Sequence, residues 1–98
     1  MNTDVQTEVI SLKSKITDDK TKTSYEQVEL REPLLVQVEQ FYAVSKNAGG
    51  LAGMRTLVSL VGSIPEPVVK NMAYSDFKKC QEYLIGFLDD TPSPNGGS

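Results

Sequence analysis

The chain has 98 residues, of which 39% are hydrophobic and 23% are charged, and its formal net charge is −3. This composition is typical of one small globular domain and excludes a wholly disordered chain. The negative charge and the scattered lysines disfavour nucleic acid as the main partner, because phosphate binding needs clustered basic residues. The polar N-terminus lacks the features of a signal peptide, and no apolar run approaches the ~20 residues of a membrane span. We expect a protein of the cytoplasm.

The sequence contains no group of residues that indicates a reaction. It has no histidine and a single cysteine, Cys80, and it has neither a phosphate-binding glycine loop nor the spacing of metal ligands. The adjacent carboxylates Asp18 and Asp19 do not make an EF-hand loop. Cys80 lies on the apolar stripe of a predicted helix, which is typical of a core residue. We therefore expect a binding protein rather than an enzyme, with no metal and no cofactor.

An N-terminal β-hairpin is predicted from alternating apolar residues. Ile10 and Leu12 share one face of the first strand, and polar residues alternate with them. The segment Thr17-Asp18-Asp19-Lys20 is the predicted turn, because aspartate side chains bond to nearby backbone groups. Val28 and Leu30 on the return strand are expected to join Ile10 and Leu12. An isolated hairpin is marginally stable, so we expect helices to cover this face.

The tetrapeptide Leu30-Arg31-Glu32-Pro33 marks the change from a period of two to helical spacing. Pro33 is expected to open the first helix, where a missing N–H costs nothing. Glu32 places negative charge at the positive end of that helix. We interpret Arg31 and Glu32 as a structural pair that ties the last strand to the first helix, through a salt bridge or backbone hydrogen bonds. The alternative is that the pair grips a partner.

Four amphipathic helices are predicted after Pro33. The first two are separated by Asn47-Ala48-Gly49-Gly50, and the second runs from about Leu51 to Val61. The predicted buried stripe of the first helix is Leu34, Leu35, Val38, Phe41 and Tyr42. The predicted buried stripe of the second, the most central helix, is Leu51, Met54, Leu57, Val58 and Val61.

A short third helix and a longer fourth helix complete the predicted fold. Ser63 and Glu66 have the spacing of a capping box at the start of the third helix, and Ser75 is the predicted N-cap of the fourth. The predicted stripe of the fourth helix is Phe77, Cys80, Leu84, Phe87 and Leu88. The fold class is therefore α+β, a hairpin followed by a small bundle of about four helices. We expect a disordered N-terminus at 1–8, one domain at 9–89 and a flexible tail at 90–98.

Four apolar residues fall off the main helical stripes: Val36, Val44, Tyr83 and Ile85. They are candidates for a patch that binds a partner or mediates self-association. The alternative is that they are ordinary exposed apolar residues or part of a second core face.

The motifs, taken in order, resemble those of phage tail assembly chaperones, the short E-type proteins of contractile-tailed, Mu-like phages and prophages. The residues that carry the resemblance are Ile10, Leu12 and Ile16, then Leu30-Arg31-Glu32-Pro33, then Leu57, Leu60, Gly62 and Pro65, and finally Asp76-Phe77. The resemblance covers about residues 9–89. The turn departs from it, because Asp18-Asp19 stands where an Asp-Gly pair is common.

The resemblance implies a binding function in virion morphogenesis. Such proteins coat the tape measure protein until tail tube subunits polymerise around it, act in the cytoplasm of the bacterial host, and are absent from the mature virion. Translational frameshifting produces a longer form, which offers a route to the tail tube protein. The competing hypothesis is a small helical adaptor or transcriptional regulator. It predicts a basic recognition helix, but in residues 76–88 Lys78 and Lys79 are balanced by Asp76 and Glu82.

Overall fold

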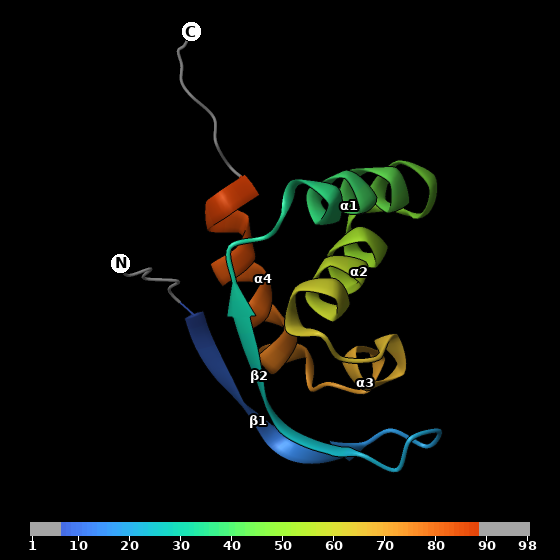
Figure 1. Ribbon diagram of the computed structural model, residues 1–98, viewed down its shortest axis with the longest axis vertical. Helices are drawn as coiled ribbons and strands as arrows, with labels where there is room; N and C mark the ends of the chain where they lie inside the picture. The colour runs from blue at the N-terminus through green and yellow to red at the C-terminus, as the bar shows by residue number, and fades with distance from the viewer. Residues whose placement is uncertain (1–6, 89–98) are drawn as a thin grey trace, which may run out of the picture.

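The computed structural model describes residues 7–88, which form two antiparallel strands followed by four helices (Figure 1). The elements are β1 (Thr7–Thr17), β2 (Ser24–Arg31), α1 (Leu35–Ala48), α2 (Gly50–Gly62), α3 (Glu66–Lys70) and α4 (Tyr74–Leu88). The predicted α+β class is confirmed. Disorder is predicted for 1–8, but Thr7 and Glu8 belong to β1. The rest of that segment and the predicted tail at 90–98 lie outside the described residues.

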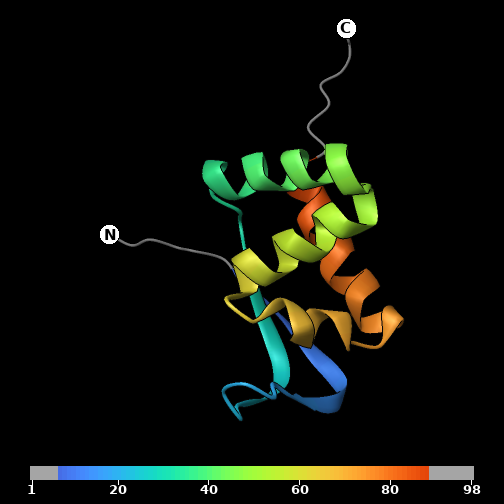
Figure 2. The same cartoon turned by 90° about the vertical axis from the view of Figure 1, so that its right-hand side faces the viewer.

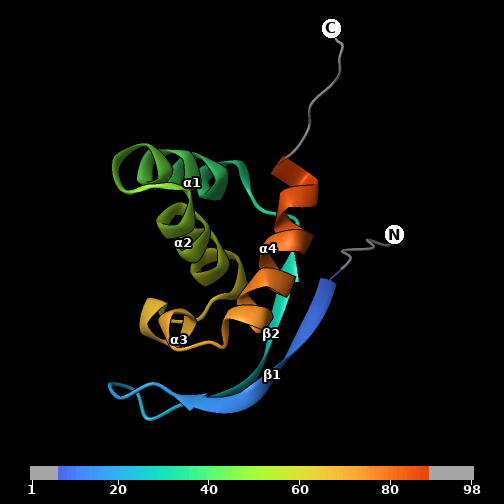
Figure 3. The same ribbon diagram turned by 180° about the vertical axis from the view of Figure 1, so that it is seen from behind.

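The hairpin is bent by an irregularity in β1. Ser11 pairs with Gln27, and the next paired residues are Ile16 and Tyr25, so four residues of β1 lie opposite one residue of β2, Glu26. Extra residues in one strand bend a hairpin and increase its twist. The turn end of the hairpin accordingly curves toward the side of α3 (Figures 1 and 3).

The turn is longer than the predicted tetrapeptide, because β2 begins only at Ser24. The Asp18 carboxylate accepts hydrogen bonds from the Thr21 backbone N–H at 3.0 Å and from the Thr21 hydroxyl at 2.8 Å. Lys22 takes a left-handed conformation with φ 61°, and its N–H donates to the Asp18 carbonyl at 2.8 Å. Asp18 therefore stabilises the turn as predicted, although the turn encloses more residues.

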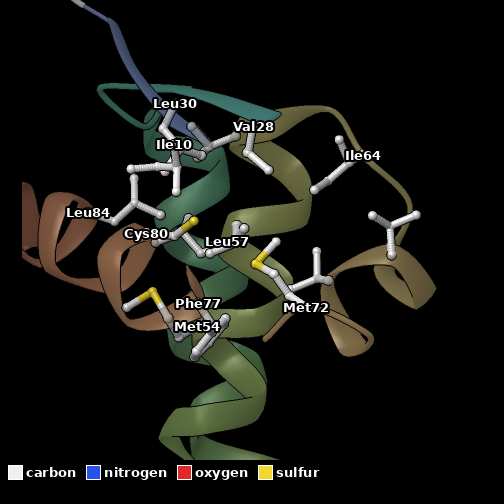
Figure 4. Packing of buried hydrophobic residues seen from close by; sticks show 14 residues of the cluster. Ile10, Val28, Leu30, Met54, Leu57, Ile64, Met72, Phe77, Cys80 and Leu84 are labelled. Carbon is white, nitrogen blue, oxygen red and sulfur yellow. The ribbon is translucent and has the colours of Figure 1, made fainter. Parts of the chain in front are cut away.

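A single hydrophobic core lies between the hairpin and helices α2, α3 and α4 (Figure 4). Its buried members are Ile10, Val28, Leu30, Met54, Leu57, Val58, Val61, Ile64, Val68, Val69, Met72, Phe77, Cys80 and Leu84. The predicted inward face of the hairpin is confirmed, with Leu12 packed at the margin of the core. Helix α2 is central as predicted, since it contributes four of these residues.

Helix α1 contributes no buried residue to this core, and Phe41 packs against the core only as a partly buried side chain. The predicted stripe is wrong for Leu34, Leu35 and Tyr42, which are 63%, 75% and 56% exposed. The helix packs mainly against α2, which supports only one side of it (Figure 1). The approach is close: a Cβ atom at Gly53 of α2 would lie 2.9 Å from the Phe41 carbonyl oxygen.

The junction before α1 differs from its prediction in one respect. Pro33 does not open the helix, because Leu34 is the N-cap and the helix begins at Leu35. Gln37 makes the polar contacts at this end. Its side-chain oxygen accepts from the Leu34 N–H at 2.8 Å, and its amide nitrogen donates to the Leu60 carbonyl of α2 at 3.3 Å.

The predicted capping box at the third helix is wrong. Ser63 ends α2 in a left-handed conformation with φ 56°, and Pro65 is the N-cap of α3. Glu66 instead accepts a hydrogen bond from the Thr56 hydroxyl of α2 at 2.8 Å. Its carboxylate therefore joins two helices rather than closing the start of one.

The start of α4 is tied to the bend in the hairpin. The helix begins at Tyr74, so the predicted N-cap Ser75 lies in its first turn. Asp76 in the same turn is 1% exposed, and its Oδ2 accepts a hydrogen bond from the Lys13 N–H at 2.8 Å. Lys13 lies in the bulged part of β1, where it has no partner in β2. The Asp76 carboxylate therefore satisfies a backbone donor that the bulge leaves free.

Candidate docking groove

The titratable side chains of the interior include a single thiol, that of Cys80, which is buried in the core. No three His, Cys, Asp or Glu side chains within residues 7–88 are grouped as a metal site requires. Burial, and then the negative charge of Asp76, raise the pKa of the Cys80 thiol to about 11. This thiol is protonated at neutral pH and shielded from solvent, unlike a nucleophile.

Residues of all four helices line two adjoining hollows. Figure 2 shows the arrangement of these helices, with α4 passing the corner between α1 and α2. The larger hollow, of about 520 Å³, is lined by Phe41, Gly50, Leu51, Met54, Tyr74, Gln81, Ile85 and Leu88. The smaller, of about 330 Å³, is lined by Leu51, Arg55, Val69, Lys70, Met72, Tyr74 and Phe77. Leu51 and Tyr74 line both, so the hollows form one surface, which we call the groove.

The groove exposes large apolar side chains to water, and these side chains lie next to buried residues of the core. Leu51 is 62% exposed and Tyr74 is 63% exposed, although the predicted stripe places Leu51 inside. The Tyr74 ring stacks on Phe77 with ring centroids 6.3 Å apart, and Phe77 is buried. The floor of the groove is thus continuous with the core. Exposed apolar surface of this kind is typical of sites that bind other proteins.

Leu51 is exposed because of where the chain turns. Gly49, with φ 100°, connects α1 to α2 without room for an intervening loop. The first turn of α2 therefore lies at the edge of the molecule, beyond the part of the helix that α4 and the hairpin cover. Met54, one turn later, is already buried. The periodicity of α2 is that of a buried helix, but the described residues leave the Leu51 side chain in its first turn largely uncovered.

The four residues predicted to bind a partner do not form one surface. Ile85 is 39% exposed and lines the larger hollow of the groove. Val36 is 58% exposed on α1 but does not line the groove, and Val44 is half-buried. Tyr83 packs against the core cluster.

Tyr83 lies on a different side of α4 from the groove. Partial burial, and then the carboxylates of Glu8 and Glu32, raise the pKa of its phenol above the ordinary value of 10.0. These carboxylates belong to β1 and to the junction, so Tyr83 faces the hairpin rather than the hollows. Two residues further along, Ile85 is on the groove side, as expected for positions about 200° apart on a helix.

The junction combines a buried residue with an exposed pair. Leu30 has no exposed surface and belongs to the core, whereas Arg31 and Glu32 are both exposed. The pair lines a small hollow of about 190 Å³ together with Gln37 and Leu60. Gln37, which the sequence patterns do not single out, accepts a hydrogen bond from the Leu34 N–H at the start of its own helix and donates one to the Leu60 carbonyl of α2.

The comparison with protein families decides the identity of the domain. Residues 9–89 match the family described as phage tail assembly chaperone proteins, E, or 41 or 14. This chain belongs to that family. The suspected resemblance is therefore confirmed, over the same span of residues. No curated protein and no solved structure shows significant similarity to the chaperone.

The motif residues that carry the family resemblance mainly stabilise the fold of the chaperone. Leu30, Leu57 and Phe77 are core residues, and Asp76 bonds to the bulge of the hairpin. A Cβ atom at Gly62 would lie 2.9 Å from the Val28 side chain, so this glycine allows α2 to approach β2. Of these residues, Phe77 also lines the smaller hollow of the groove, at its floor, and the others do not line the groove. No helix within the described residues has both the length and the apolar character to span a bilayer.

Proposed function

We propose that this chaperone binds the tape measure protein during tail morphogenesis and shields its apolar surface in the groove. The observation that supports the proposal is the pair of solvent-exposed side chains, Leu51 and Tyr74, set above a floor that reaches the core. A helix-in-groove contact buries the apolar stripe of an amphipathic helix against such a surface. A long helical client offers many such stripes, and several copies of the chaperone would cover it.

The proposal places the chaperone in the cytoplasm of the bacterial host and outside the mature virion. In it, a frameshifted longer form adds a C-terminal domain that reaches the tail tube protein, and neighbouring copies associate along the client. A slippery heptamer near the 3′ end of the gene, with an overlapping frame ahead of a tape measure gene, would support the longer form. A gene without tail genes beside it would count against the whole proposal.

Co-expression with the tape measure protein of the same phage or prophage tests the groove. The wild-type chaperone is expected to raise the soluble yield of the client, and Leu51→Asp is expected to abolish most of that gain. Leu35→Asp is the matched control, because Leu35 is also in the first turn of a helix and is 75% exposed, but does not line the groove. An aspartate is tolerated by the dipole in both first turns.

The two variants separate the possible results. If Leu51→Asp protects the client as well as the wild type does, the groove is not the binding site. If only Leu35→Asp loses protection, the outer face of α1 binds the client instead. If the wild-type chaperone gives no gain in soluble client, the proposed function is refuted.

A further inference from the structure

The charges around the groove have one sign, although the chain as a whole is negative. Arg55 and Lys70 line the smaller hollow, and no Asp or Glu of the described residues lines either hollow. The Lys78 ammonium lies 5.8 Å from the centre of the Tyr74 ring, at the boundary between the hollows. An apolar surface is thus bordered by cations.

Arg55 is placed to attract a carboxylate. The residue is half-buried, and its Nε is shielded from solvent without a hydrogen-bond acceptor among the described residues. Glu66 of α3, whose helix also lines this hollow, accepts its hydrogen bond from the neighbouring Thr56. A partly desolvated guanidinium binds a carboxylate more strongly than a fully hydrated ammonium does, because its donors match both carboxylate oxygens.

We infer that the groove selects an amphipathic helix whose apolar stripe is bordered by Asp or Glu. The apolar side chains fill the two hollows, and the carboxylates pair with Arg55 and Lys70. This inference rests on the proposed function and narrows it, because it specifies which segments of the tape measure protein are held. Arg55 and Lys70 at the edge of the groove repel an apolar helix that is bordered by Lys or Arg, because the charges have the same sign.

Two synthetic helical peptides of about 20 residues, long enough to span ~30 Å, test this selection on the wild-type protein. They share one apolar stripe and differ only in having Glu or Lys beside it. Fluorescence anisotropy is expected to show the Glu peptide binding about tenfold more tightly at low salt. The preference is expected to fall to about twofold at ~0.5 M salt, because screening weakens exposed ion pairs.

A matched pair of double variants locates the selection. Arg55→Glu with Lys70→Glu is expected to reverse the preference between the peptides. Arg31→Glu with Lys79→Glu changes the net charge equally, with the same residue types and outside the groove lining, and is expected to leave the preference intact. Thermal unfolding of all variants is measured alongside, and the wild-type peptide comparison needs no variant.

Equal binding of the two peptides, or no binding of either, overturns the inference. Protection of the tape measure protein in co-expression would then still support the proposed function, so the two failures are distinguishable. Reversal by the control double variant would also overturn the inference, because the selection would follow net charge. Self-association that displaces the Glu peptide would mean that a second copy occupies the groove.

Discussion

Replacing Gly53 by alanine is expected to loosen α1 from α2. A Cβ atom at this position would collide with the Ser45 side chain and would lie 2.9 Å from the Phe41 carbonyl oxygen. The serine hydroxyl can rotate, but the carbonyl belongs to the backbone of α1 and can retreat only if the helix moves. Since α1 has no fully buried residue, the other contacts that hold it are partly buried, such as that of Phe41, or exposed, such as the hydrogen bond from Gln37 to Leu60.

The magnitude follows from two opposing effects. Overpacking of a close contact costs about 1–3 kcal/mol, and alanine in place of glycine in a helix returns about 1 kcal/mol. Gly86→Ala in α4 is the matched control, because a Cβ atom there meets nothing within 4 Å. We expect Gly53→Ala to be about 1 kcal/mol less stable than the wild type and Gly86→Ala about 1 kcal/mol more stable.

Urea unfolding followed by circular dichroism measures this difference. With a denaturant slope of about 1–2 kcal/mol/M for a small domain, the two unfolding midpoints should differ by roughly 1–2 M. Hydrogen exchange should show faster exchange in α1 of Gly53→Ala and little change in α4. Equal stability of the two variants would refute the reasoning, because it would mean that α1 already stands away from Gly53.

Three further results are expected from buried or bonded polar groups. Asp76→Ala should lower the free energy of unfolding by about 1–3 kcal/mol, because the Lys13 N–H loses its acceptor. Asp76→Asn keeps an acceptor oxygen and should lower it less in the same urea assay. Equal losses in the two variants would contradict this explanation. Cys80, whose thiol pKa is raised to about 11, should react with thiol reagents at pH 8 only as fast as the protein unfolds, and immediate labelling would contradict its burial. Hydrogen bonds from Thr21 hold the pKa of Asp18 below its ordinary value of 3.8, so the stability that Asp18 adds is present above about pH 4 and lost as the pH falls through the lowered pKa. Asp18→Asn should therefore reduce stability at pH 7 and make little difference at about pH 2, and an equal deficit at both pH values would refute the assignment.

The hairpin and the helices of the core were predictable because their side chains repeat at one period and are buried. Val28 and Leu30 alternate on β2, and both are buried against helices as expected. Phe77, Cys80 and Leu84 follow α4 in the same way. Burial of one face constrains the sequence at every second residue of a strand or every third to fourth residue of a helix, so the pattern and the packing agree.

The exposure of α1 could not be read from its periodicity. Leu35 and Tyr42 lie seven positions apart, which is the spacing of a buried stripe, but both face water. A stripe records that a surface is apolar and does not say whether the covering surface belongs to the same chain. The close contact at Gly53 and the hydrogen bond from Gln37 to the Leu60 carbonyl show which side of α1 meets α2. The same ambiguity hides the groove, since Leu51 has the periodicity of a core residue.

The small number of exposed apolar side chains in the groove has a consequence for how the chaperone would work. Fully burying a leucine or a tyrosine contributes about 1.5–3 kcal/mol each, so Leu51 and Tyr74 together supply only a few kcal/mol before the cost of association is subtracted. A single copy would therefore hold a client segment weakly. Weak sites repeated along one client still bind it firmly together, because each further contact is made at high effective concentration. When the copies leave one at a time, each departure has to overcome only the weak affinity of a single site. A chaperone that must release its client requires this property.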